Sequence, residues 1–242
     1  MRSPVRGGQL PLELGHSPSH AEADFILGEG NELAYAHVVA FPNWAGPLTL
    51  LTGPAKSGKS HLARIWAARA DARIAEPVEV ESLSREAGTG PLVVEDVDRL
   101  DYEEAALFHL LNQSMRDRRP LLMTARDTVA EWPFRTDDLK SRARLAAHFS
   151  VHTTDDIQLS HMLVKLFGDR QVSVDPKVIS YLVARMERSA EEAVILAQML
   201  DEMALARGSA ITRGLAAEVL ALRGAAQDDG QLKLDLEGHD DE

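Results

Sequence analysis

The chain has 242 residues, no cysteine and a net charge of −12, with 45% hydrophobic and 26% charged residues, a composition typical of globular proteins. The lack of cysteine excludes a disulfide framework, a cysteine zinc site and a thiol nucleophile, and it fits a reducing, cytoplasmic location. The acidic balance argues against sequence-independent duplex binding, and the sequence has neither a membrane-spanning apolar run nor a secretory signal.

The charge is spread unevenly along the chain. Residues 225–242 contain seven acidic residues and one lysine, so this segment carries a charge of −6, half of the total. Composition and periodicity together divide the chain into four parts. We expect a flexible leader over 1–24, a nucleotide-binding α/β domain over 25–155, a small helical domain over 156–223, and an acidic, disordered tail over 224–242.

Buried strands alternate with helices in the second part. Strands are predicted from apolar runs over 48–52, 92–94, 121–124 and 148–152. Helices are predicted over 31–39, 59–70 and 103–116. The segment 72–80 is a candidate edge strand because Pro77 interrupts it. The alternation predicts an α/β fold with a parallel sheet. Four helical segments with no strand between them follow, over 157–167, 176–186, 190–206 and 212–222.

A phosphate-binding motif lies between the first strand and the helix that follows it. The pattern G-x-x-x-x-G-K-S is matched in full, and His61 comes directly after it; the candidate cofactor-binding residues are Gly53, Pro54, Ala55, Lys56, Ser57, Gly58, Lys59, Ser60 and His61. Lys59 would reach the β- and γ-phosphates of ATP or ADP, and the Ser60 hydroxyl would ligate Mg²⁺. The alternative is a Gly/Ser turn that contains a lysine by chance. Lys56 is expected to be solvated.

Two acidic residues end the strand predicted over 92–94. Glu95 and Asp96 would lie at its carboxyl end, where one carboxylate would hold Mg²⁺ through water and the other would orient the attacking water. Ser60, Glu95 and Asp96 are therefore the candidate Mg²⁺ site. The alternative is a solvated acidic turn.

At this point the chain resembles the AAA+ proteins, and within them the DnaA-related ones. Residues 25–31 resemble the segment that packs beside the adenine, and Leu121–Thr124 resembles the sensor-1 strand, with Thr124 near the γ-phosphate. Residues 138–142 resemble the box that carries the arginine finger, which falls on Arg142. The resemblance implies that Arg142 acts in trans on a neighbour's nucleotide; the alternative is a surface ion pair. Residues 156–223 resemble the AAA+ lid.

Two positions depart from the family pattern. The first residue of the acidic pair is Asp in the family but Glu95 here, and the lid arginine of sensor 2 is replaced by Glu191, with Arg188 as the nearest substitute. A longer carboxylate alters the Mg²⁺ geometry, and a carboxylate at sensor 2 would repel a γ-phosphate. We therefore expect nucleotide binding with weak or no intrinsic ATPase activity.

The leader contains the pattern Q-L-x-L-x-L, carried by Gln9, Leu10, Leu12 and Leu14. In an extended chain the three leucines share one face, which suits a peptide that enters a partner's groove; the alternative is a strand that packs on its own domain. The pattern resembles the clamp-binding motif of bacterial replication proteins. Together with the AAA+ module it resembles the Hda family, which implies a negative regulator of replication initiation that binds the sliding clamp and stimulates ATP hydrolysis by DnaA.

The same pattern recurs in the tail at Gln231–Leu236. It is either a second clamp peptide, which would add avidity on a two-fold clamp, or a chance repeat in an acidic tail.

Other functions remain open at this stage. A DnaA-like helicase loader would need efficient ATP hydrolysis and self-association, and a P-loop kinase would need a substrate pocket. After Leu222 the chain carries no helix-turn-helix module, so no direct specific DNA binding is expected. No membrane partner is expected, and the resemblance allows a homo-oligomer.

Overall fold

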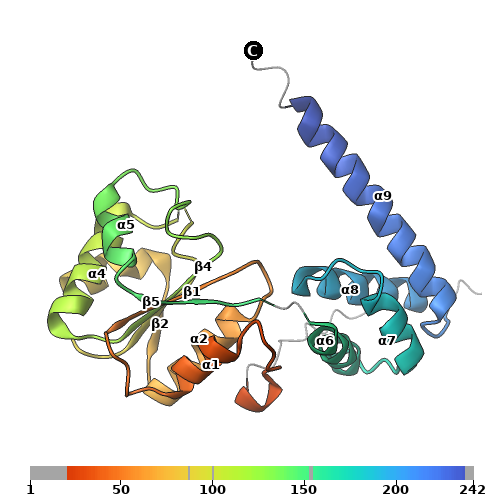
Figure 1. The fold of residues 1–242 in the computed structure, drawn as a ribbon, viewed down its shortest axis with the longest axis horizontal. Helices are drawn as coiled ribbons and strands as arrows, with labels where there is room; N and C mark the ends of the chain where they lie inside the picture. Colours follow the sequence, from red (N-terminus) through yellow and green to blue (C-terminus); the bar gives the residue numbers. More distant parts are fainter. Residues whose placement is uncertain (1–20, 87, 100, 153–154, 238–242) are drawn as a thin grey trace, which may run out of the picture.

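A computed structural model describes residues 21–86, 88–99, 101–152 and 155–237 (Figure 1). The clamp-peptide residues predicted in the leader, Gln9, Leu10, Leu12 and Leu14, lie outside these ranges and stay a prediction. No helix in the described ranges is long and apolar enough to cross a membrane.

The first part of the described chain alternates helices and strands, as its hydrophobic pattern predicts. The helices are α1 (Glu32–Val39), α2 (Lys59–Ala70), α3 (Val80–Arg85), α4 (Glu104–Asp117) and α5 (Asp137–Ala143), with 3-10 turns η1 (Glu22–Asp24) and η2 (Pro77–Glu79). The strands are β1 (Leu48–Thr52), β2 (Arg73–Ala75), β3 (Leu92–Val94), β4 (Leu121–Ala125) and β5 (Ala147–Ser150).

The described strands form one five-stranded sheet in the order β2-β3-β4-β1-β5, and every neighbouring pair is parallel. The expected α/β class and parallel sheet are therefore confirmed. β1 lies between β4 and β5, and its register places Leu51 opposite Thr124. As predicted, β2 is an edge strand. The carboxyl ends of β1, β3 and β4 consequently meet at one edge of the sheet, where ligands bind in open parallel sheets.

Helices lie on both sides of the sheet (Figure 1). Alternate residues of a strand point to opposite faces, so they meet two different helical layers. Leu50 and Met123 pack into a cluster with α3, α4 and α5, whereas Leu51 and Leu122 pack against α1 and α2, where Trp66 is fully buried. Because both faces are covered there, β1, β3 and β4 are fully buried apolar runs, and those runs are what made them predictable.

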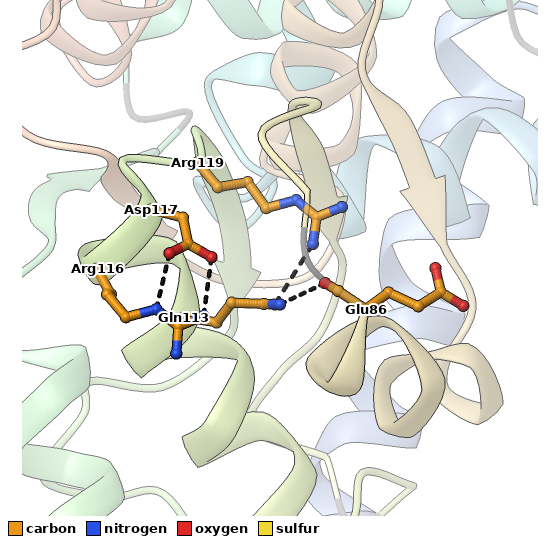
Figure 2. A network of polar contacts seen from close by, with 5 residues as sticks. All are labelled: Glu86, Gln113, Arg116, Asp117 and Arg119. Carbon is orange, nitrogen blue, oxygen red and sulfur yellow. Dashed lines mark hydrogen bonds and ion pairs between the residues drawn. The ribbon is translucent and has the colours of Figure 1, made fainter.

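A buried arginine fastens the chain that leads into β3 (Figure 2). The Arg119 side chain is 7% exposed, and its Nε donates to the carbonyl oxygen of Gly90 at 2.9 Å. Gln113 faces Arg119 from α4 and donates to the carbonyl oxygen of Glu86. Burial lowers the pKa of Arg119, because the charged guanidinium group loses hydration there.

The second part is helical: α6 (Asp156–Asp169), α7 (Pro176–Val183), α8 (Ala190–Arg207) and α9 (Arg213–Glu237). These helices share a separate core that includes Leu163, Leu182 and Leu200, and they lie beside the sheet domain in Figure 1. The N-caps Asp175 and Ser189 accept backbone N–H groups of Lys177 and Glu192, so the sequence marks where α7 and α8 begin.

The structure differs from the sequence expectations at two described segments. Only Arg73–Ala75 of the segment 72–80 is a strand, because Glu76 and Glu79 form a capping box around Pro77 and start helical backbone there. The tail expected to be disordered from residue 224 instead continues α9 to Glu237. The repeat at Gln231–Leu236 therefore lies on helical backbone, whereas a clamp peptide of the kind predicted is extended.

Candidate functional site

The phosphate-loop motif forms the turn between β1 and α2, as predicted. Gly53 has φ +148°, and a Cβ there would lie 2.1 Å from the carbonyl oxygen of Val151, so only glycine fits. Gly58 has φ +103° at the N-cap of α2, and no side chain of the described ranges caps this helix. The first N–H groups of α2 therefore remain available to an anion, and the helix dipole favours negative charge there.

Lys59 is the cation at the centre of this turn. Its side chain is 6% exposed, and Nζ donates to the carbonyl oxygens of Gly53 at 2.7 Å and Pro54 at 2.8 Å. Burial lowers the Lys59 pKa, the charge of Asp96 raises it and that of Arg126 lowers it. A buried ammonium group held by two carbonyl oxygens is matched to an incoming phosphate, which would return the hydration energy lost on burial.

The acidic pair lies in the turn that follows β3. Asp96 has φ +50°, and its backbone N–H donates to Thr124 Oγ1 at 2.9 Å. The Val97 N–H donates to the Thr124 carbonyl oxygen at 2.8 Å. Thr124, the expected sensor-1 residue, is fully buried and fixes the acidic turn to the end of β4. The structure thus brings the candidate residues from three strands together at one edge of the sheet.

Several buried polar atoms at this edge have no partner among the described residues. They are Ser57 Oγ, Glu95 Oε1 and Asp98 Oδ1. Leaving a buried polar atom unpaired costs about 1–3 kcal/mol, so each such atom calls for a ligand or a water. The described residues contain no preformed group of three His, Asp or Glu side chains for a metal. Mg²⁺ at Ser60, Glu95 and Asp96 would therefore need nucleotide phosphate oxygens as further ligands.

Arg126 is a further charged residue at this edge, which the sequence analysis did not single out. It is exposed, follows β4 directly, and its charge acts on Lys59. Its backbone N–H donates to Asp98 Oδ2 at 2.7 Å, which links the acidic turn to the next loop. Arg126 also lines a hollow of about 400 Å³ together with Glu95, Asp96 and Tyr102. Arg126 comes directly after the apolar run of β4, and this position at the carboxyl end of a strand was the signal in the sequence that could have identified it.

Residues 25–31, expected beside the base, pack against the phosphate-loop helix. The Phe25 ring meets His61 edge to face at a centroid distance of 5.2 Å and stacks on Tyr35 at 5.6 Å. Gln158 of α6, which the sequence reasoning also missed, is buried and donates to the carbonyl oxygen of Ile26 at 3.1 Å. Its Oε1 is buried with no partner among the described residues.

The two candidate arginines lie elsewhere. Arg142 is exposed on α5, whose Leu139 and Ala143 are buried in the core, and it is not among the charges that shift the Lys59 pKa. Arg188 pairs with Asp156 across the surface of the helical domain at 3.1 Å. Glu191 is exposed at the start of α8. The described contacts therefore do not join either arginine to the phosphate loop of the same chain.

Solved structures of other proteins share this architecture. Domain III of the replication initiation protein DnaA from Thermotoga maritima matches with a TM-score of 0.69 and 14% identity, over 85% of this chain and 97% of that one. AMPPCP-bound DnaA from Aquifex aeolicus matches with a TM-score of 0.60 and 17% identity, over 89% and 71%. This chain has a DnaA-like AAA+ fold.

A related motor protein shares the fold. The RuvB Holliday junction branch migration motor of Thermotoga maritima matches with a TM-score of 0.57 and 16% identity, over 73% of this chain and 61% of that one. No protein-family model and no curated protein matches the sequence. At these identities the likeness establishes the fold, so the function has to be argued from the residues.

Proposed function

We propose that this protein is a nucleotide-bound AAA+ regulator of the Hda type, which restrains replication initiation by stimulating ATP hydrolysis on DnaA at the sliding clamp. The observation that carries the proposal is the phosphate-loop geometry: buried Lys59, the uncapped start of α2 and unpaired Ser57 Oγ suit a nucleoside diphosphate or triphosphate. The solved DnaA structures that bind AMPPCP support the same ligand class.

Within this proposal the chain's own residues divide the work. Lys59 and the N–H groups of the loop hold the phosphates, and Ser60 with the acidic pair holds Mg²⁺, which neutralises phosphate charge when bound. Glu95 and Glu191 limit hydrolysis in the protein's own site, so the nucleotide serves as a resident ligand. A regulator of this kind needs a stable bound state more than turnover.

Arg142 is the proposed catalytic contribution to the partner. It is exposed on α5, and the buried residues Leu139 and Ala143 pack this helix into the core and hold it in place. An arginine supplied in trans can raise hydrolysis by roughly 10³ to 10⁵ through stabilisation of phosphate charge. Residues 9–14 are proposed to bring the protein to the clamp, and no direct specific DNA contact is invoked.

The proposal is tested by measuring hydrolysis of ATP bound to DnaA, with this protein added, in the presence and absence of clamp loaded on DNA. Stimulation that needs the clamp and is lost in Arg142→Ala is the expected result. Arg144→Ala is the matched control, because Arg144 is also an exposed arginine, two residues further on. Rapid ATP hydrolysis by this protein alone, with no effect on DnaA, would favour the helicase-loader alternative and refute the regulator.

A further inference from the structure

The first described residues form a strap across the nucleotide-binding domain. We define the strap as Ala21–Asn31. At its start, His61 Nε2 lies 2.9 Å from the carbonyl oxygen of Ala21. Since a carbonyl oxygen can only accept, Nε2 carries the proton. His61 directly follows Ser60, the proposed Mg²⁺ ligand, so this hydrogen bond joins the strap to the phosphate loop.

Phe25 makes a second contact between the strap and the phosphate loop. A Cβ at Gly58 would lie 3.4 Å from Phe25 Cε2, so the ring packs at van der Waals distance over the glycine that starts α2. The same ring touches His61 and Tyr35. The position of the Phe25 ring and the conformation of the loop are therefore linked by direct packing.

Glu22 anchors the strap to two helices. Its carboxylate accepts from Arg69 Nε at 2.9 Å and from the second guanidinium nitrogen of Arg69 at 2.7 Å, which is a bidentate pair. It also accepts from the Tyr35 hydroxyl at 2.8 Å. Hydrogen bonding to Arg69 and Tyr35 lowers the Glu22 pKa, so the carboxylate is ionised at neutral pH.

The other side of the strap is held by the lid helix α6. Lys165 Nζ donates to the carbonyl oxygen of Asp24 at 3.2 Å, and Gln158 Nε2 donates to that of Ile26 at 3.1 Å. At the end of the strap, the His152 N–H donates to the carbonyl oxygen of Gly30 at 2.9 Å. One short segment thus contacts the phosphate-loop helix, the lid helix and the chain that joins the two domains.

We propose that the strap positions the phosphate loop, and that Glu22 couples nucleotide affinity to how firmly the chain entering at Ala21 is held. This inference rests on the proposed nucleotide binding and names its regulation. Coupling between two sites is reciprocal. Binding of nucleotide therefore tightens the strap. A partner that binds residues 1–20 and alters the strap changes the affinity for nucleotide, and nucleotide changes the affinity for that partner by the same factor.

Affinity for Mg²⁺-ADP, measured by calorimetry on the full chain, tests the strap. Glu22→Ala is expected to weaken binding about fivefold or more, the lower end of measured couplings between sites. The matched control is Glu218→Ala, which removes a glutamate that is likewise paired with an arginine, Arg207, in the helical domain. Glu22→Gln keeps the size of the side chain, and is expected to lie between wild type and Glu22→Ala.

A second readout separates positioning from simple loss of stability. Hydrogen exchange of the amides of residues 22–25 is expected to slow when Mg²⁺-ADP binds the wild type and the control, and to change little in Glu22→Ala. Glu22 variants that bind as tightly as wild type would overturn the inference and leave the nucleotide site intact. Absence of Mg²⁺-ADP binding by the wild type would refute the proposed function and the inference with it.

Discussion

Lys59→Met is the sharpest test of the phosphate-loop assignment, because methionine keeps the length of the side chain and removes its charge. In the structure Nζ makes two hydrogen bonds to carbonyl oxygens. Nucleotide binding would exchange them for bonds to phosphate oxygens. Charged hydrogen bonds contribute roughly 1.5–3 kcal/mol each and bonds to carbonyl oxygens about 1 kcal/mol, so exchanging two of them gives a net loss of about 1–4 kcal/mol. That corresponds to about 5- to 1,000-fold in the dissociation constant.

The assay is calorimetric titration of wild type and variant with Mg²⁺-ADP at one salt concentration, with thermal unfolding as a check that both fold. Lys177→Met is the control, since Lys177 is exposed at the start of α7 in the lid. A Lys59→Met protein that binds within about threefold of wild type, or a control that loses as much affinity, would refute the reasoning.

Three further predictions concern other parts of the molecule. Replacing the four fixed residues of the 9–14 peptide with alanine is expected to abolish clamp binding in a pull-down, whereas deletion of residues 225–242, which removes the second copy of the pattern, leaves it unchanged; the reverse pattern would contradict the leader assignment. Burial lowers the His37 pKa below 6.5, so the unfolded state takes up its proton first, and the free energy of unfolding should fall as the pH drops from about 7 to 5. His37→Phe should flatten this slope in denaturant titrations, and an unchanged slope would exclude His37 as the cause. Glu22→Gln should lower the unfolding temperature at neutral pH but not below the lowered Glu22 pKa, because that stabilisation is lost once the carboxylate is protonated.

The parts of the fold that were predictable are those with a local cause. β1 and β4 are apolar runs because they are buried on both faces, and the glycines of the phosphate loop are required by positive φ and by the approach of Val151. The lid helices carry their own N-caps. These features are dictated within a few residues of sequence, and the fixed spacing of the loop residues points directly to phosphate.

The parts that were missed depend on contacts between distant segments. α3 is only six residues long, too short for hydrophobic periodicity to identify it. Arg126 and Gln158 gain their roles from the turn after β3 and from the strap, which lie far from them in sequence. The continuation of α9 beyond residue 224 is itself a segment of low apolar content, and composition alone favoured disorder there.

The strand order has a consequence for how the protein is made. β1 leaves the ribosome early, yet both of its neighbours are late: β4 begins at Leu121 and β5 ends at Ser150. About 100 residues separate the end of β1 from the end of β5, so at 5–20 residues per second β1 waits roughly 5–20 s for its second partner. During that time the apolar run Leu48–Thr52 is an unpaired strand that a chaperone can hold. β1, and with it the phosphate loop that follows it, therefore gains its full set of strand neighbours only when the α/β domain is almost complete.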